Sequence, residues 1–213
     1  MTRLADDPAT AVVTVAKTMD EAGLAPGKSG NVSCREGDGF LITPSGIPYH
    51  ELVPADIARL DAAGKVRAAS RRPSSEWRMH AAIYSRRPEV QAIVHTHSPN
   101  ATALACAHRS IPAFHYMIAL AGGEVRCAPY ATFGSEELAA HAVAGLEGRR
   151  ATLLANHGVV AVGTSLRAAL GVAIEVENLA RQYLALLAAG LEPVILDAAE
   201  MARVIERFAD YGR

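Results

Sequence analysis

The chain has few cysteines and lacks the apolar runs that cross membranes. Its 213 residues include three cysteines, Cys34, Cys106 and Cys127, and no two of them form a C-x-x-C pair. An odd number of scattered cysteines argues against a disulfide framework, and we expect free thiols in a reducing cytoplasm. The most apolar stretch, 179–191, is interrupted by an arginine and a glutamine. No run approaches the ~20 apolar residues that a transmembrane helix needs.

Other absences exclude further classes of protein. The acidic first residues lack the pattern of a signal peptide. The formal net charge is -1, and the basic residues form no stripe of the kind that nucleic acids require, so we expect no nucleic-acid or membrane partner. Neither G-x-G-x-x-G nor G-x-x-x-x-G-K-[ST] occurs. Half of the residues are hydrophobic, enough for one compact domain or a small two-lobed one.

The hydrophobic periodicity predicts both helices and strands. Helices are predicted over 7–23, 76–87, 99–107, 134–146 and 165–190 and within the last twenty residues. Strands are predicted over 32–34, 40–43, 57–61, 92–95, 151–155 and 159–162. The turn Gly37-Asp-Gly39 is typical of a β-hairpin. Because hairpins and helices both join the strands, we predict a mixed sheet flanked by helices rather than a doubly wound nucleotide fold.

Two histidines follow an apolar run directly in the stretch Ala92-Ile-Val-His-Thr-His-Ser98. Residues i and i+2 of a strand share a face, so His95 and His97 point the same way. His157 stands at the end of another apolar strand, and Glu76 stands in the first turn of a predicted helix. A catalytic zinc site takes three or four protein ligands of these types and one exchangeable position. The four residues predict a metal site in which Glu76 is a ligand, a base or both.

The remaining histidines fit ordinary structural roles better. His50, His108 and His141 lie in a predicted turn or on helices without partners, and a lone histidine is more often a core or surface residue than a ligand. His80 follows Glu76 by four residues, so the two share a helix face and form a weaker alternative ligand pair. We expect His80 to support the site or the fold rather than to bind the ion.

Three turns rich in glycine or serine could together bind an anion. They are Ser29-Gly30-Asn31, Pro44-Ser45-Gly46 and Ser74-Ser75. The third turn begins the helix that carries Glu76, and backbone N–H groups at a helix N-terminus favour a phosphate. Each turn alone is a weak signal. Together they predict a phosphate site beside the metal.

These residues carry a family resemblance. Five motifs resemble those of the class II aldolase/adducin family, namely Gly30-Asn-Val-Ser33, Ile42-Thr-Pro-Ser-Gly46, Pro73-Ser-Ser-Glu76, His95-Thr-His97 and His157-Gly158. The stretches 73–78, 110–118 and 128–134 resemble the members of that family that act on L-fuculose 1-phosphate. The similarity runs from about Gly23 to the end of the chain.

The resemblance implies a fold and an assembly. It implies a three-layer α/β/α fold with a mixed, largely antiparallel central sheet, built by residues 1–213 as a single domain whose tail, from about residue 192, closes over the site. It implies one zinc ion per subunit and a C4 homotetramer with sites at the subunit interfaces. The zinc would be held by His95, His97 and His157, with Glu76 as a displaceable fourth ligand.

The resemblance also assigns roles to single residues. Glu76 would act as the base, and Tyr116 would reach in from a neighbouring subunit as the proton donor. Tyr211, in the C-terminal tail, would close over the site. The substrate's phosphate would be bound by Gly30, Asn31, Ser45, Gly46, Ser74 and Ser75.

The reaction so implied is reversible retro-aldol cleavage of a ketose 1-phosphate to dihydroxyacetone phosphate and an aldehyde such as lactaldehyde. L-fuculose 1-phosphate or a related deoxy-ketose 1-phosphate would be the substrate. A pentulose-phosphate 4-epimerase and a sugar-phosphate dehydratase of the same family are alternatives. A non-catalytic adducin-like interaction domain is a remote one, because such domains should lack the metal-binding histidines.

Other positions bear on the mechanism and on the aldehyde. Lys17, Lys28 and Lys65 lie in a predicted helix or polar turns, which argues against a Schiff-base mechanism. Thr96 stands where the resembling aldolases have Asn, and Asn156 stands where they have His. Both side chains flank the predicted metal ligands, and they leave the identity of the aldehyde open.

Overall fold

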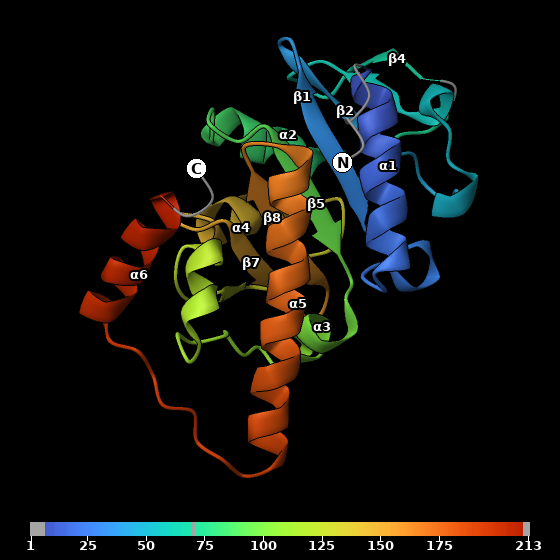
Figure 1. Cartoon of the computed structure of the whole chain (residues 1–213). Coiled ribbons are helices and arrows are strands. Elements are labelled where there is room, and N and C mark those ends of the chain that lie inside the picture. Colours follow the sequence, from blue (N-terminus) through green and yellow to red (C-terminus); the bar gives the residue numbers. More distant parts are fainter. Residues whose placement is uncertain (1–6, 70, 211–213) are drawn as a thin grey trace.

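A central sheet of eight strands organises the protein, in a computed structural model that describes residues 7–69 and 71–210 (Figure 1). The strands are β1 (Asn31–Glu36), β2 (Gly39–Ile42), β3 (Ala58–Leu60), β4 (Val66–Ala68), β5 (Ala92–Thr96), β6 (Arg126–Ala128), β7 (Ala151–Leu154) and β8 (Gly158–Gly163). Their order across the sheet is β4-β3-β2-β1-β5-β8-β7-β6. All neighbours pair antiparallel except β6 and β7.

Helices cover both faces of this sheet. They are α1 (Pro8–Glu21), α2 (Trp77–Arg86), α3 (Pro99–Cys106), α4 (Glu136–Gly145), α5 (Leu166–Ala188) and α6 (Ala198–Asp210), with the 3-10 helices η1 (Pro26–Lys28) and η4 (Tyr116–Ala121) among the connections. In Figure 1, α1 and α5 lie in front of the sheet. The buried side chains of α1, α3 and α5 form one core, and those of α2 and α4 form the other. The predicted α/β/α fold with a mixed, largely antiparallel sheet is confirmed.

The alternation of side chains along each strand separates the two cores. In β5, Ala92 and Val94 face the core of α1, α3 and α5, whereas Ile93 faces the core of α2 and α4. In β1, Val32 and Cys34 face the first core. The intervening polar residues of these two strands must therefore point toward α2. This alternation sets the position of the candidate site.

Two strands and part of a third were absent from the sequence prediction. The residues of β4 are exposed, and β6 has three residues with no apolar alternation. Such short edge strands form because their backbones complete a ladder, which local sequence does not record. Asn31 was assigned to a turn, yet it begins β1 and pairs with His95 of β5. None of the helices in the described ranges is long and apolar enough to cross a membrane.

Candidate active site

Four predicted ligands meet at the centre of the sheet. His95 lies in β5, two residues beyond Ile93, and so points toward α2. Glu76 is the N-cap residue of α2, and His157 lies in the turn between β7 and β8. His97 follows the last residue of β5. Their ligand atoms all lie within 4.8 Å of one another, so the structure brings together the cluster that the sequence predicts.

Ring nitrogens and carboxylate oxygens face each other across this cluster. The Nε2 atoms of His95 and His97 are 3.0 Å apart. Glu76 Oε2 lies 3.1 Å from His95 Nε2, and Glu76 Oε1 lies 3.2 Å from His157 Nε2. His95 Nδ1 is 2.8 Å from the carbonyl oxygen of Val159, which can only accept, so Nδ1 carries the hydrogen. In the neutral ring, the lone pair of Nε2 is thereby aimed into the cluster, as in histidine ligands of metal ions.

The donor set fits a transition-metal ion. Glu76 Oε1 is buried and accepts no hydrogen bond from the described residues. A buried carboxylate oxygen without a donor is costly unless a cation is close. Three imidazoles and one carboxylate are ligands of Zn²⁺ and of neighbouring first-row metals. The cluster of Glu76, His95, His97 and His157 is therefore where a metal ion would bind.

The ionisation of these groups suits metal binding. Burial alone would raise the pKa of Glu76, but the imidazoles of His95 and His157 hold that pKa well below its ordinary range. Burial, together with His95 and His157, lowers the pKa of His97 to about 3. Burial also disfavours the charged form of His95, yet the Glu76 carboxylate outweighs it and raises the pKa of His95. A proton and a metal ion therefore compete at His95, whereas Glu76 and His97 are already in their ligand forms.

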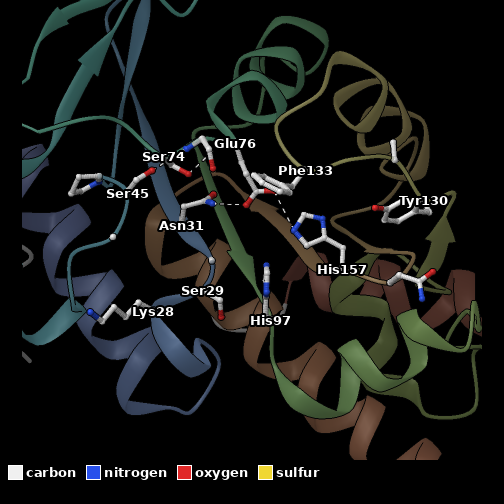
Figure 2. A pocket seen from close by; sticks show the side chains of 16 residues that line it. Lys28, Ser29, Asn31, Ser45, Ser74, Glu76, His97, Tyr130, Phe133 and His157 are labelled. Carbon is white, nitrogen blue, oxygen red and sulfur yellow. Dashed lines mark hydrogen bonds and ion pairs between the residues drawn. The ribbon is translucent and has the colours of Figure 1, made fainter.

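A cavity of about 450 Å³ adjoins the cluster. Its lining includes all six residues of the predicted phosphate site, Gly30, Asn31, Ser45, Gly46, Ser74 and Ser75. Three of the four candidate ligands, Glu76, His97 and His157, also line it. In Figure 2, Ser45 and Ser74 lie on one side of Glu76 and His157, and Tyr130 lies on the other. The strand order explains this arrangement. The three turns lie near β1 and β2, whereas Tyr130 follows β6, the strand at one edge of the sheet.

Hydrogen bonds hold two of the predicted phosphate turns together. Ser45 Oγ donates to the carbonyl of Pro73 at 3.1 Å and accepts from the backbone N–H of Ser75 at 3.2 Å. Pro44 and Pro73 form an isolated antiparallel bridge beside them. Ser74 Oγ accepts from the backbone N–H of Glu76 at 3.3 Å, at the start of α2. Ser45 therefore fixes the turns against each other, whatever contact it makes with a ligand.

Lys28 lines the cavity, although the sequence did not predict it as a site residue. Its side chain lines the cavity on the side of the phosphate turns, as Figure 2 shows. Its backbone is left-handed, with φ at 69°, between the left-handed glycines Gly27 and Gly30. The sequence places Lys28 in a polar turn and argues against a Schiff-base role for it. A lysine within a Gly-Lys-Ser-Gly turn was the available signal for a cation near a phosphate.

Two aromatic rings and an amide also line the cavity. Tyr130 and Phe133 line it, and both are more than half exposed. Asn156 also lines it, with a left-handed backbone at φ 54°. His108 Nε2 lies 2.6 Å from Asn156 Oδ1, which can only accept, so the N–H groups of Asn156 remain available to other partners. His108 is not one of the four residues of the candidate metal cluster, in line with the structural role expected for it.

Two predicted residues lie outside this cavity. Tyr116 is in η4, about half exposed, and its ring stacks on those of His115 and Phe208. It is absent from the residues that line the cavity in the described chain, and its role at a neighbouring subunit stays a prediction. Tyr211 lies outside the described residues. The closure of the tail over the site is likewise untested.

Comparison with known proteins identifies the class. Residues 10–184 match the family described as class II aldolase and adducin N-terminal domain. The chain therefore belongs to the class II aldolase/adducin family. In this family the substrate is a small phosphorylated sugar, and the similarity to aldolases below supports a lyase reaction.

Individual relatives divide between two substrates. The chain is 52% identical over 202 residues to a 5-methylthioribulose-1-phosphate/5-deoxyribulose-1-phosphate aldolase of Rhodospirillum rubrum, covering 94% of this chain and 90% of the relative. It is 47% identical to the L-fuculose phosphate aldolase of Escherichia coli, covering 94% of both chains. The solved structure of an L-fuculose 1-phosphate aldolase superposes with a TM-score of 0.93 at 42% identity, covering 96% of this chain and 97% of the other.

Proposed function

We propose that this enzyme is a zinc-dependent aldolase that reversibly cleaves a ketose 1-phosphate to dihydroxyacetone phosphate and an aldehyde. The observation that carries this proposal is the shared cavity, in which Glu76, His97 and His157 adjoin the three predicted phosphate turns. A ketose 1-phosphate bound there by its phosphate would have its carbonyl and C3 hydroxyl near the histidines. Its remaining carbons would extend toward Tyr130.

Zinc is the ion that the donor set favours. Three of the four ligands are imidazoles, and magnesium and calcium prefer oxygen ligands. When bound, the ion would polarise the substrate's carbonyl and lower the pKa of the neighbouring C–H group. The histidines hold its position, and the carboxylate of Glu76 supplies a negative charge at the same place.

Glu76 would transfer the proton at C3. In the synthetic direction its carboxylate takes that proton from dihydroxyacetone phosphate, and the new bond joins C3 to the aldehyde carbon. Tyr116 of a neighbouring subunit would donate its proton to the aldehyde oxygen, and cleavage reverses both transfers. A carboxyl pKa of about 4.3 makes an ordinary glutamate a weak base. Because the carboxylate of Glu76 would be held close to the reacting carbon, its position would compensate for part of this weakness.

A homotetramer with fourfold symmetry would complete the site. An exposed Tyr116, stacked on Phe208, is available for contact with another subunit. Tyr211 would follow α6 and cover the cavity from the C-terminal tail. This assembly and both roles rest on the resemblance to other aldolases of the family.

The favoured substrates end in an apolar group. L-fuculose 1-phosphate and 5-deoxypentulose 1-phosphates share a terminal methyl group, and the aldehyde product carries it. The ring of Tyr130 offers this group apolar surface at the end of the cavity away from the phosphate turns, and the exposed ring of Phe133 adds to the cavity lining. The amide of Asn156, oriented by His108, offers a hydrogen bond to a hydroxyl of the same part of the sugar. We propose a deoxy-ketose 1-phosphate with lactaldehyde or a smaller aldehyde as the product.

The test is a comparison of kcat/KM over ketose 1-phosphates that differ at C4 and C5, measured by the release of dihydroxyacetone phosphate. Glu76→Gln is the matched variant, because the amide keeps the shape of the side chain and loses the base. We expect a loss of at least about 100-fold in kcat with zinc content retained. Cleavage at the wild-type rate would remove Glu76 from its role. Turnover without trapped aldehyde would favour the 4-epimerase or the dehydratase.

A further inference from the structure

A continuous chain of buried hydrogen bonds runs from Glu76 into the core. Asn31 Nδ2 lies 3.0 Å from Glu76 Oε2, and Asn31 Oδ1 lies 2.5 Å from His80 Nε2. His80 Nδ1 lies 2.6 Å from Ser33 Oγ, which lies 2.7 Å from the hydroxyl of Tyr84. All five side chains are buried, and those of His80 and Ser33 are completely so.

The sequence spacing explains how this chain forms. Glu76, His80 and Tyr84 are four residues apart along α2 and lie on one face of the helix. Asn31 and Ser33 are two apart in β1, on the face opposite Val32 and therefore toward α2. The two sets of side chains interleave. Position along each element thus places a strand residue between successive helix residues.

The chemistry of the groups fixes the direction of every bond. A carboxylate oxygen can only accept, so the Asn31 amide presents its N–H to Glu76 and its carbonyl to His80. That carbonyl can also only accept, so His80 Nε2 must carry the hydrogen. His80 Nδ1 in the neutral ring is then an acceptor, and the Ser33 hydroxyl donates to it. The Tyr84 hydroxyl completes the chain by donating to Ser33 Oγ.

We propose that His80 is a positioning residue that locks the Asn31 amide with its N–H toward Glu76. With Oε2 engaged in this way, Oε1 is the oxygen left to exchange a proton with the substrate, which agrees with its lack of a hydrogen-bond donor among the described residues. The role in proton exchange rests on the proposed function. The tautomer of His80 and the orientation of Asn31 do not depend on it.

This assigns Asn31 a task besides the predicted phosphate contact. Without His80, the amide can rotate and present its carbonyl to the carboxylate, which would repel Glu76. A displaced carboxylate would still leave three imidazole ligands for the metal. The expected defect is therefore in the proton transfer rather than in the binding of substrate or ion.

The first test reads the tautomer directly. In the zinc-loaded wild-type protein, ¹⁵N and ¹H NMR of the histidine rings should give His80 as the Nε2–H tautomer between pH 6 and 8. The Nδ1–H tautomer or an imidazolium ion would overturn the proposal. An enzyme that releases no dihydroxyacetone phosphate would refute the proposed function and would not alter this spectrum, so the two failures are distinguishable.

The second test separates positioning from folding by three substitutions. His80→Leu removes both hydrogen bonds, and His80→Gln can restore a donor to Asn31 and an acceptor for Ser33. Tyr84→Phe is the matched control, because it removes one hydroxyl at the far end and leaves His80 bonded to Ser33.

We expect His80→Leu to lower kcat about 10- to 100-fold, with KM within about threefold and zinc content unchanged. His80→Gln should recover most of the loss, and Tyr84→Phe should stay within about threefold of wild type. Equal losses of kcat in His80→Leu and His80→Gln would overturn the proposal. So would an equal loss in Tyr84→Phe, because a merely structural role predicts that all three follow the melting temperature.

Discussion

Replacement of Gly30 by alanine should disturb the fold and the candidate site together. Its backbone is left-handed, with φ at 85°, and a Cβ atom added there would lie 2.4 Å from the carbonyl oxygen of His95. That oxygen belongs to the backbone of β5 and cannot rotate away. An ordinary contact needs about 3.4 Å, so Gly30→Ala must move β5 and β1 apart by about 1 Å at this point.

Gly27→Ala provides the control for the backbone strain. Gly27 is also left-handed, with φ at 66°, but nothing lies within 4 Å of an added Cβ. The left-handed conformation alone costs a residue with a side chain about 1–2 kcal/mol. In a chain of this size, 1 kcal/mol lowers Tm by about 2–4 °C. Gly27→Ala should therefore lower Tm by about 2–8 °C.

Gly30→Ala should lower both Tm and zinc affinity more than the control variant Gly27→Ala does. Forcing β5 away from β1 adds about 1–3 kcal/mol, in the range of other overpacked interiors. Because the displaced residue is His95, zinc affinity should also fall, by about 10- to 100-fold as when the support of a metal ligand is removed. Thermal melting and calorimetric titration with zinc measure the two effects. A Gly30→Ala protein that matches Gly27→Ala in both would refute the steric reasoning.

Three further predictions follow from the structure. A chelator should lower Tm and abolish cleavage, and zinc but not magnesium should restore both, because three ligands are imidazoles; equal restoration by magnesium would contradict the ligand assignment. Glu177 accepts hydrogen bonds from the backbone N–H groups of residues 100 and 101 at the start of α3, so Glu177→Gln should cost about 1–2 kcal/mol in urea unfolding. Glu175→Gln on the same helix, whose carboxylate accepts a 3.4 Å bond from Asn178, should cost less than about 0.5 kcal/mol, and similar losses would contradict the capping role. Burial lowers the pKa of His80 to about 3 in the folded protein, against about 6.5 in the unfolded chain. The unfolded chain therefore binds one more proton between these two pH values. The contribution of neutral His80 to the free energy of unfolding is complete above pH 6.5 and falls by about 1.4 kcal/mol per pH unit as the pH drops toward 3. Denaturant unfolding at pH 7, 6 and 5 should show a shallower decline in His80→Gln than in wild type, and equal slopes would count against a neutral buried His80.

Strand alternation made the ligand cluster predictable from sequence. His95 and His97 are two residues apart after an apolar run, and their rings do meet, with centroids 4.8 Å apart. The periodicity also gave the long helix 165–190, which the structure has as Leu166–Ala188. In both cases the signal is local, because a face of a helix or a strand is set by positions a few residues apart.

The remaining features depend on contacts between distant segments. Asn31 was expected in a turn, but the antiparallel register of β1 against β5 pairs it with His95. His157 was expected at the end of a strand, and it lies in the turn that joins β7 to β8. The bond between His80 and Ser33 spans 47 residues. No local pattern encodes such a register, since a shift by one residue would turn every side chain of the strand to the other face.

The distribution of unsatisfied polar atoms separates the site from the rest of the interior. Among the described residues, two buried side-chain polar atoms lack a hydrogen-bond partner, Thr102 Oγ1 and Glu76 Oε1. Thr102 lies in α3, away from the cavity lining, and its hydroxyl is neutral. Glu76 carries a charge, its Oε2 accepts a hydrogen bond from Asn31, and its Oε1 lies 3.2 Å from His157 Nε2 within the candidate metal cluster. Apart from the neutral hydroxyl of Thr102, the buried polar side chains of the described residues have partners, and Glu76 Oε1 is the one charged acceptor left open, where the proposed reaction needs a ligand and a base.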